Sequence, residues 1–221
     1  LNFIAKRCNN LGHLLKEVRV VRDEKKQIIK SVKELSKKYD NLFTTGGIGP
    51  THDDITAECV ALAFKRKLVL NKKAHKLLIN HYKKTDIELN ESRLKMAKVP
   101  TNSKLIKNSV SSAPGFKIKN VWVLAGVPKI MQAMFIEGIE PNLTKGKKIV
   151  SKSIRVLKPE GDIAKFLSEL QANYTKIDIG SYPFYNPPQI GTTIIFRGYE
   201  NKSINNAIKL LCKYLTKAKI Q

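Results

Sequence analysis

The residues with the clearest chemistry lie in one segment, Leu42 to Thr56, which reads LFTTGGIGPTHDDIT. A short apolar run ends at Thr45, a glycine-rich loop follows, and a helical pattern comes next. Glycines let backbone N–H groups approach an anion without a Cβ in the way, and a helix N-terminus adds free amides and a positive dipole end. The segment therefore predicts a site for a phosphate or a similar anion. Its spacing is neither the dinucleotide fingerprint nor a P-loop, so a tight structural turn stays an alternative.

Two acidic residues, Asp53 and Asp54, stand where their charge would repel a phosphate. In one reading, Thr51 and Asp54 form a capping box, and the carboxylates only satisfy amides of the helix's first turn. In the other, at least one carboxylate holds Mg²⁺ or a similar hard cation that bridges to the phosphates. Such a cation could polarise a phosphoryl oxygen and generate hydroxide. In this second reading Asp53 and Asp54 are candidate catalytic residues and metal ligands.

Alternating strand and helix patterns must position this loop. They predict an α/β fold, a three-layer α/β/α sandwich with a mostly parallel sheet that would bind ligands at the carboxyl ends of its strands. No strand precedes the first helix, so we expect this chain to lack the first strand of its fold. The predicted elements are an opening helix that stops at Gly12, a strand over Leu15–Val21, a helix capped by Asp23, a buried strand over Asp40–Thr45, helices over Asp54–Phe64, Lys72–Tyr82 and Glu91–Ala97, a strand over Val121–Ala125 and a helix opened by Pro128.

The C-terminal third has a different order of elements. The pattern predicts strand, helix, strand, strand and helix, which is most of a ferredoxin-like unit. We therefore expect two domains, residues 1–148 and a small α+β domain of residues 149–221. The predicted elements are Lys152–Leu157, Asp162–Ala172, Lys176–Phe184, Thr192–Gly198 and Ser203–Lys217.

The 221 residues carry a formal net charge of +23, which first suggests nucleic acid or an anionic membrane as a partner. However, 34 of the 41 basic residues are lysines spread along the chain. Arginine, which binds phosphate and guanine better than lysine does, is scarce. A genome rich in A and T supplies many Lys, Asn and Ile codons and would explain the excess. We therefore do not expect nucleic acid as the main partner, and an anionic small molecule is equally compatible with the charge.

Other broad features concern compartment and assembly. No apolar run approaches the roughly 20 residues that span a bilayer, and we expect no secretory signal. The three cysteines never form C-x-x-C, so we expect reduced thiols, no zinc site, a cytoplasmic location and no membrane partner. The sequence does not determine the oligomeric state, and a homo-oligomer is one of the states that it allows.

The segment TTGGIGPTHDDIT closely resembles the signature of the molybdopterin-binding (MoaB/Mog-like) superfamily. It is closest to the branch that contains the N-terminal domains of the competence-damage protein CinA and of eukaryotic FAD synthase. Ser112–Gly115 and Val121–Pro128 resemble the family's second loop, in the expected order. The resemblance runs from Leu1 to about Met134, and the tail around Ile179–Phe184 looks like the extension beside the FAD-synthase-type domain. The family normally begins with an earlier strand, which agrees with a missing first strand here.

The resemblance implies ligand binding between the two loops. Asp54 and Thr56 match the acidic and hydroxyl positions of the Mog-type motif, whereas Asp53 stands where that branch has arginine. A carboxylate in place of arginine weakens the case for molybdopterin and favours a metal-dependent reaction. Ala125 replaces the usual proline of the second loop and would re-aim it slightly. The implied ligand-binding residues are Thr45, Gly46, Gly47, Gly49, Thr51, Thr56, Ser112, Pro114, Gly115, Gly126 and Pro128.

CinA-like and FAD-synthase-like members are associated with cleavage of a pyrophosphate bond. The resemblance thus implies a metal-dependent nucleotide pyrophosphatase that acts on FAD, ADP-ribose or a similar dinucleotide, with Mg²⁺, Mn²⁺ or Co²⁺ as cofactor. Two alternatives stay open: a molybdopterin-binding protein of molybdenum-cofactor biosynthesis, and a basic nucleic-acid-associated protein. In the first two readings the partner is a small phosphate-containing molecule, a nucleotide or a pterin.

Several other residues are weaker candidates. His52 could be a general acid or a ligand, although a loop histidine more often faces solvent. Lys129 could contact a phosphate, although a solvated lysine is more common. His75 and His81 lie on one predicted helix among lysines, and we expect no metal role there. A final group resembles an aromatic binding patch, although such residues more often close a small core: Tyr182, Phe184 and Tyr185.

Overall fold

The computed structural model describes residues 1–217 and divides the chain into two compact units. The first unit contains Leu1–Ile4 and Lys16–Thr144, and the second contains Ala5–Leu15 and the residues from Lys145 onward. The opening helix α1 (Asn2–Asn10) therefore contributes to both units. No helix in the described part of the chain is both long and apolar enough to cross a membrane.

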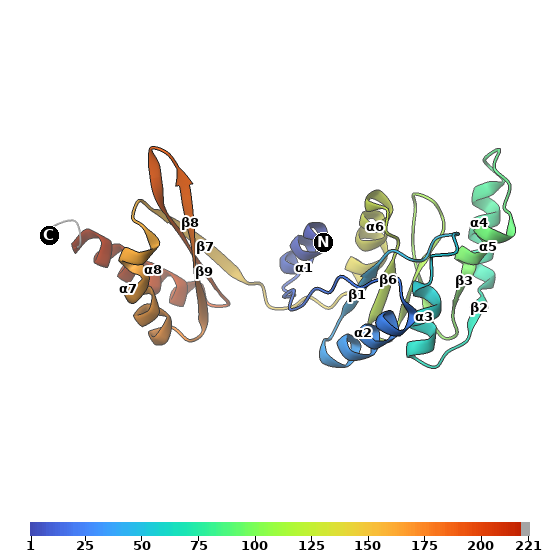
Figure 1. The fold of residues 1–221 in the computed structure, drawn as a ribbon, viewed down its shortest axis with the longest axis horizontal. Helices are drawn as coiled ribbons and strands as arrows, with labels where there is room; N and C mark the ends of the chain where they lie inside the picture. The colour runs from blue at the N-terminus through green and yellow to red at the C-terminus, as the bar shows by residue number, and fades with distance from the viewer. Residues whose placement is uncertain (218–221) are drawn as a thin grey trace. The chain divides into compact units, whose positions relative to one another are not determined.

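The first unit is built on a four-stranded sheet, shown in Figure 1. Its strands are β1 (Leu42–Thr45), β4 (Lys104–Ile106), β5 (Gly115–Ile118) and β6 (Val121–Leu124), in the order β1-β6-β5-β4. A second sheet pairs β2 (Leu68–Leu70) with β3 (Lys98–Pro100). The helices of the unit are α2 (Lys25–Lys38), α3 (Thr56–Ala63), α4 (Lys72–Tyr82), α5 (Glu91–Leu94) and α6 (Pro128–Met134), with short turns η1 (Lys95–Ala97), η2 (Phe135–Ile139) and η3 (Glu140–Asn142).

The α/β class is confirmed, but the expectation of a mostly parallel sheet is wrong for the described strands. β1 and β6 are parallel, whereas β5 pairs antiparallel with both β6 and β4. The sequence analysis missed β2 to β5, which are only three or four residues long. Strands this short contain at most two residues on each face, so they carry too few alternations to reveal a period of two.

Successive residues of a strand point to opposite sides of the sheet, so the main sheet has two sets of side chains to bury, one on each face. Val121 and Val123 pack with Val32 and Cys59 in the core beneath α2 and α3. On the other face, Phe43 stacks on Trp122 with ring centroids 6.5 Å apart, and Phe43 also lies 5.6 Å from the Phe135 ring of η2. The result is a layer of helix on each side of the sheet.

The strand predicted over Leu15–Val21 is wrong, and so is the Asp23 cap. The segment forms no strand, and Val20 is fully exposed, so its alternation buries nothing. The residue at the α2 N-cap is Glu24, and its side chain makes no capping bond. The other predicted helices are present within a few residues of their expected bounds.

The segment before α2 is held by ion pairs rather than by strand pairing. The Glu17 carboxylate accepts hydrogen bonds from Arg19 Nε at 2.7 Å, Lys38 Nζ at 2.9 Å and the Tyr39 hydroxyl at 2.7 Å. Arg19 also reaches Glu34 on α2 at 2.6 Å. The bond from Tyr39, followed by those from Lys38 and Arg19, lowers the pKa of Glu17 to about 2.

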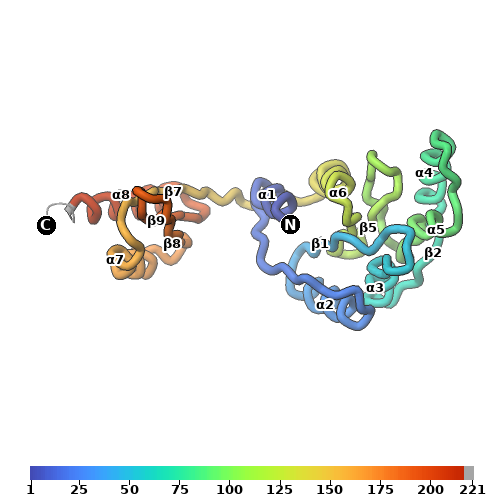
Figure 2. The backbone as a smooth tube through the Cα atoms, turned by 45° about the horizontal axis from the view of Figure 1, so that its top comes forward, coloured from blue at the N-terminus to red at the C-terminus, as the bar shows by residue number. Residues whose placement is uncertain are grey.

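The second unit contains a three-stranded antiparallel sheet in the order β7-β9-β8, with β7 (Val150–Val156), β8 (Ile177–Asn186) and β9 (Gln189–Gly198). Helix α7 (Glu160–Asn173) follows β7, and α8 (Asn201–Lys217) follows β9. Because β9 runs antiparallel to both neighbours, β7 and β8 are parallel to each other across it. This is the split β-α-β arrangement predicted from the element order, and Figure 2 traces it.

We expect Glu17→Gln to make stability less dependent on pH. Since the pKa of Glu17 is lowered from 4.5 to about 2 on folding, its contribution is fully present above pH 4.5 and is lost as pH falls toward 2. Urea unfolding of both proteins along a pH series should give a stability difference that shrinks over this window. A difference that stays constant from neutral to acid pH would contradict this account.

Candidate functional site

The glycine loop begins at the carboxyl end of β1, beside the end of β6. Gly46 and Gly47 have φ angles of +95° and +70°, a backbone conformation that glycine adopts without strain. The Gly46 N–H donates to the Leu124 carbonyl at 3.0 Å. A Cβ on Gly126 would lie 3.2 Å from the Gly46 Cα. The two loops that the sequence singled out therefore touch at Gly46 and Gly126.

Thr56 fixes the shape of the first loop from the start of α3. Its N–H donates to the Gly47 carbonyl at 2.9 Å. A Cβ on Gly47 would lie 2.0 Å from the Thr56 hydroxyl, so that side chain fills the space over the glycine. Thr56 is also buried. The Thr56 side chain therefore supports the conformation of the loop at Gly47.

Asp54 holds the other part of the loop in place through hydrogen bonds. Its carboxylate accepts hydrogen bonds from the Thr51 N–H at 2.9 Å and from the Thr51 hydroxyl, and the Gly49 backbone also lowers its pKa. Burial alone would raise the pKa of Asp54, but these bonds and the nearby charge of Lys95 outweigh burial and lower it. A capping box at the first turn of the helix is wrong, because α3 begins only at Thr56 with Ile55 as its N-cap. The Thr51–Asp54 bonds lie within the loop itself.

Asp53 differs from Asp54 in its environment. It is exposed, and a hydrogen bond from the Thr51 side chain is the main cause that lowers its pKa. Both aspartates are therefore ionised at neutral pH. The described residues contain no cluster of three or more His, Cys, Asp or Glu side chains that could hold a metal. A divalent cation at this loop would have carboxylate oxygens from the pair and would take its other ligands from water and from ligand phosphates, a common arrangement for Mg²⁺.

A cavity of about 150 Å³ lies against this loop and is lined by several parts of the chain. Gly49, His52 and Asp54 belong to the first loop, and Pro114 belongs to the second. A further part of the wall was not predicted from the sequence: Lys95 and Met96 of η1 and Lys98, the first residue of β3. The remaining lining residues include Glu58 of α3 and Leu68 of β2.

Lys95 is the most informative of the missed residues. Its ammonium donates a hydrogen bond to the Thr51 carbonyl, and its charge acts on Asp54. The sequence offered one signal, a pair of cations three residues apart within ESRLKMAKVP. In a chain with 34 lysines this pair could not be told from the background.

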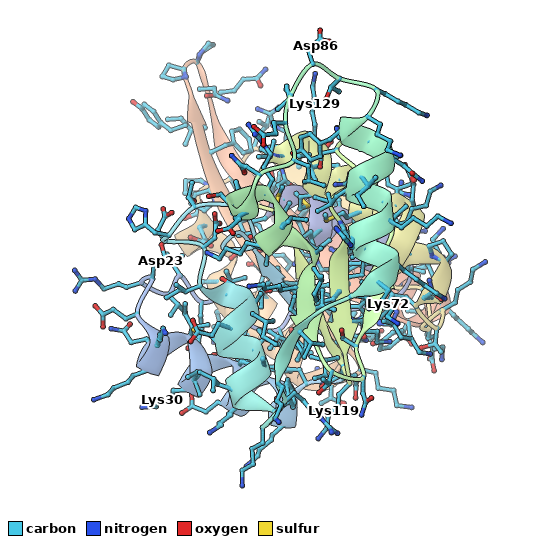
Figure 3. The ribbon with its side chains drawn as sticks, turned by 90° about the vertical axis from the view of Figure 1, so that its right-hand side faces the viewer. Asp23, Lys30, Lys72, Asp86, Lys119 and Lys129 are labelled. Carbon is cyan, nitrogen blue, oxygen red and sulfur yellow. The ribbon has the colours of Figure 1, made fainter. Side chains whose placement is uncertain are left out.

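Other predicted residues are placed elsewhere. Ser112 interacts with His81 Nδ1 at 3.3 Å and does not line the cavity. Gly115 is packed within β5, where a Cβ would lie 2.3 Å from the Val123 carbonyl oxygen. Pro128 begins α6, and Lys129 beside it is exposed. Figure 3 shows Lys129 and other lysines, such as Lys30, Lys72 and Lys119, well separated over the surface.

The architecture is that of an α/β domain whose loop after β1 borders a cavity. Residues 1–145 match the family model described as "Probable molybdopterin binding domain", and residues 148–221 match "FAD synthase, middle domain". The chain belongs to the first of these families, and the resemblance seen in the sequence is confirmed.

Relatives support the same assignment. A protein of Archaeoglobus fulgidus is 33% identical over 94% of this chain and 86% of its own length. A protein of Pyrococcus furiosus, PF0476, is 35% identical over 75% of this chain and 71% of its own. The crystal structure of the protein CinA, of unknown function, from Thermoplasma acidophilum has a TM-score of 0.56 and 32% identity. That match covers 61% of this chain and 81% of the CinA chain.

We expect Gly47→Ala to destabilise the first unit by at least about 2 kcal/mol, because it combines a positive φ with a clash against Thr56. Gly161→Ala is a matched control, since a Cβ there meets nothing within 4 Å. That control should change stability by less than about 1 kcal/mol. Urea unfolding measures both, and equal effects would contradict the geometry described for the loop.

Proposed function

We propose that the first unit hydrolyses the diphosphate bond of a nucleotide such as FAD or ADP-ribose, with a divalent cation. The observation that supports this most is the composition of the cavity wall. Lys95 and Lys98 line one cavity together with the glycine loop and the ionised carboxylate of Asp54. Glu58 also lines the cavity, but its carboxylate is paired with Lys25 at 2.7 Å. This combination suits an anionic ligand that arrives together with a cation.

The balance of charge explains why a cation is part of the proposal. A diphosphate brings two negative charges, which the lysines and the backbone N–H groups of the loop can attract. The aspartates would repel the same ligand, because their pKa values are lowered and both stay charged. A bound divalent cation removes this conflict, and when bound it lowers the pKa of its water and stabilises charge on the phosphoryl oxygens. Asp53 is the more exposed of the two carboxylates, and Thr51 bonds to both of them. Asp54 is the one that lines the cavity.

The reaction is a simple hydrolysis. Water adds to one phosphorus, the bridging P–O bond breaks, and the two protons of the water end on the phosphate products. FAD would give FMN and AMP, and ADP-ribose would give AMP and ribose 5-phosphate. In this scheme the loop orients the diphosphate, and Lys95 and Lys98 neutralise the charge on its oxygens.

We expect Asp53→Asn to lower the rate of AMP release from FAD or ADP-ribose by ten- to a hundredfold or more, because a neutral amide holds a cation poorly. The assay uses Mg²⁺, Mn²⁺ or Co²⁺ in turn, with a chelator as blank. Asp40→Asn is the matched control, since Asp40 is exposed and precedes the opposite end of β1. Asp54→Asn should lose activity and loop stability together, whereas Asp53→Asn should keep its stability.

Two outcomes would count against the proposal. Full activity of both aspartate variants would remove the carboxylates from the reaction. Tight binding of molybdopterin, without metal-dependent release of AMP from any dinucleotide, would favour the alternative that the family's description suggests.

Lys95 provides an independent test of the cavity. We expect Lys95→Gln to raise KM for the dinucleotide about tenfold with a smaller change in kcat, because the lost charge serves mainly to bind phosphate. Lys73→Gln, at an exposed position of α4, should leave both constants unchanged. Steady-state kinetics measures KM and kcat of both variants. Equal effects of the two substitutions would mean that binding depends on the overall charge of the protein and not on the position of Lys95.

A further inference from the structure

The sheet of the second unit has two unlike faces. Ile177, Ile194 and Phe196 point to the face that packs on α7 and α8 and are buried in the core of the unit. The residues between them in sequence point the other way, as strand geometry requires. That opposite face carries exposed Arg155, Tyr182 and Arg197, and also the exposed Asp178, which pairs with Arg197 across the strands.

Tyr182 presents its ring on this face. A Cβ on Gly180 would lie 3.1 Å from Cε2 and 3.4 Å from the hydroxyl oxygen of Tyr182. The ring therefore leans back over the glycine, two residues earlier on the same strand. The Tyr182 residue is nevertheless 49% exposed. One side of the ring is supported by the sheet, which leaves the rest of the side chain open to solvent.

Arg155 forms a second flat surface on the same face. Its guanidinium lies 4.0 Å from the centroid of the Phe184 ring, and it also donates to Gln189 at 3.3 Å. The Phe184 ring is in turn packed close to Gly191, where a Cβ would lie 2.7 Å from Cζ. A cation stacked on an aromatic ring is held in place and exposes a planar group.

The two surfaces are neighbours on the sheet. Arg155 on β7 and Tyr182 on β8 both pair with Thr193 of β9, which lies between them. Two strand spacings separate their backbones by about 10 Å. Thr193 lies between Arg155 and Tyr182, and Gly191 pairs with Phe184. Beyond Tyr182, Gly180 pairs with the half-buried Ile195, so a single aliphatic residue, rather than a continuous aliphatic patch, accompanies the flat stacking groups.

We propose that this face binds single-stranded nucleic acid, with one base on Tyr182 and another on the Arg155–Phe184 pair. Stacking of bases on aromatic rings and on guanidinium planes over an open sheet is a common way to bind single strands. The unit as a whole is positively charged, because residues 149–221 contain 11 basic and 5 acidic side chains, and one of the acidic residues, Asp178, pairs with Arg197 on this face. Two of the seven arginines of the chain, Arg155 and Arg197, lie on this one face. The site is independent of the pyrophosphatase proposal, and it does not depend on the lysine content of the whole chain.

The test uses the full chain and labelled oligonucleotides of about twelve residues, oligouridylate and oligothymidylate, with a DNA duplex of similar length. Fluorescence anisotropy at several salt concentrations should show binding to single strands and much weaker binding to the duplex. Tyr182→Ala should weaken binding about tenfold or more, while Tyr182→Phe should stay within about twofold of the parent. Arg155→Gln should also reduce the slope of log affinity against log salt by about 0.7. Stronger binding of one of the two single strands would identify RNA or DNA as the source.

Two matched controls separate stacking from general charge. Tyr185→Ala removes an aromatic ring that is 73% exposed but lies at the alternate position of the same strand. Lys165→Gln removes an exposed cation from α7, on the opposite side of the sheet. Both should leave affinity within about twofold of the parent. The proposal is overturned if single strands do not bind at low salt, if the duplex binds equally well, if Tyr182→Ala changes nothing, or if Lys165→Gln costs as much as Arg155→Gln.

Discussion

The candidate site depends on how one carboxylate is satisfied. Asp54 accepts the N–H and the hydroxyl of Thr51, and it lies so close to Gly49 that a Cβ there would fall 2.6 Å from its Oδ2. These bonds hold a glycine-rich loop in one conformation, although its residues have more backbone freedom to lose than most. At the other end of the loop, Thr56 holds Gly47 in the same way. The loop is thus held by Asp54 from within and by Thr56 from the start of α3.

This arrangement changes how the two aspartates are understood. A pair of adjacent carboxylates suggests two equivalent metal ligands, but the two differ in exposure: Asp53 is exposed, whereas Asp54 is half-buried and holds the loop through its bonds with Thr51. Lys95 bonds to the Thr51 carbonyl and its charge lowers the pKa of Asp54, so it links loop shape to the charge of the cavity. Asp54 thus helps to fix the loop, while Asp53 keeps an exposed carboxylate beside it.

In the second unit, one face of the sheet packs on the helices to form the core, and the other face is exposed to solvent. Its helices cover one face and bury aliphatic side chains such as Ile194. On the other face, glycines at 180 and 191 leave room for the rings of Tyr182 and Phe184 to lie against the strands. The sequence alone favoured a core role for these aromatic residues, because rings in small domains are usually buried. The exposure of Tyr182 and Tyr185 shows that they are not part of the core.

Local patterns in the sequence determined many of the helices and turns of this protein and the order of its elements. The apolar spacing of α2, α4 and α7, the glycine loop after β1 and the element order of the second unit are all properties of short segments, since helical periodicity and turn chemistry act over a few residues. The tertiary structure decided what distant segments do together. Strands β2 to β5 are too short to show a period and form only because partners lie beside them, which turned an expected parallel sheet into a mixed one. For the same reason Lys95 could not be found in advance: its position beside Thr51, 44 residues earlier in the chain, exists only after folding.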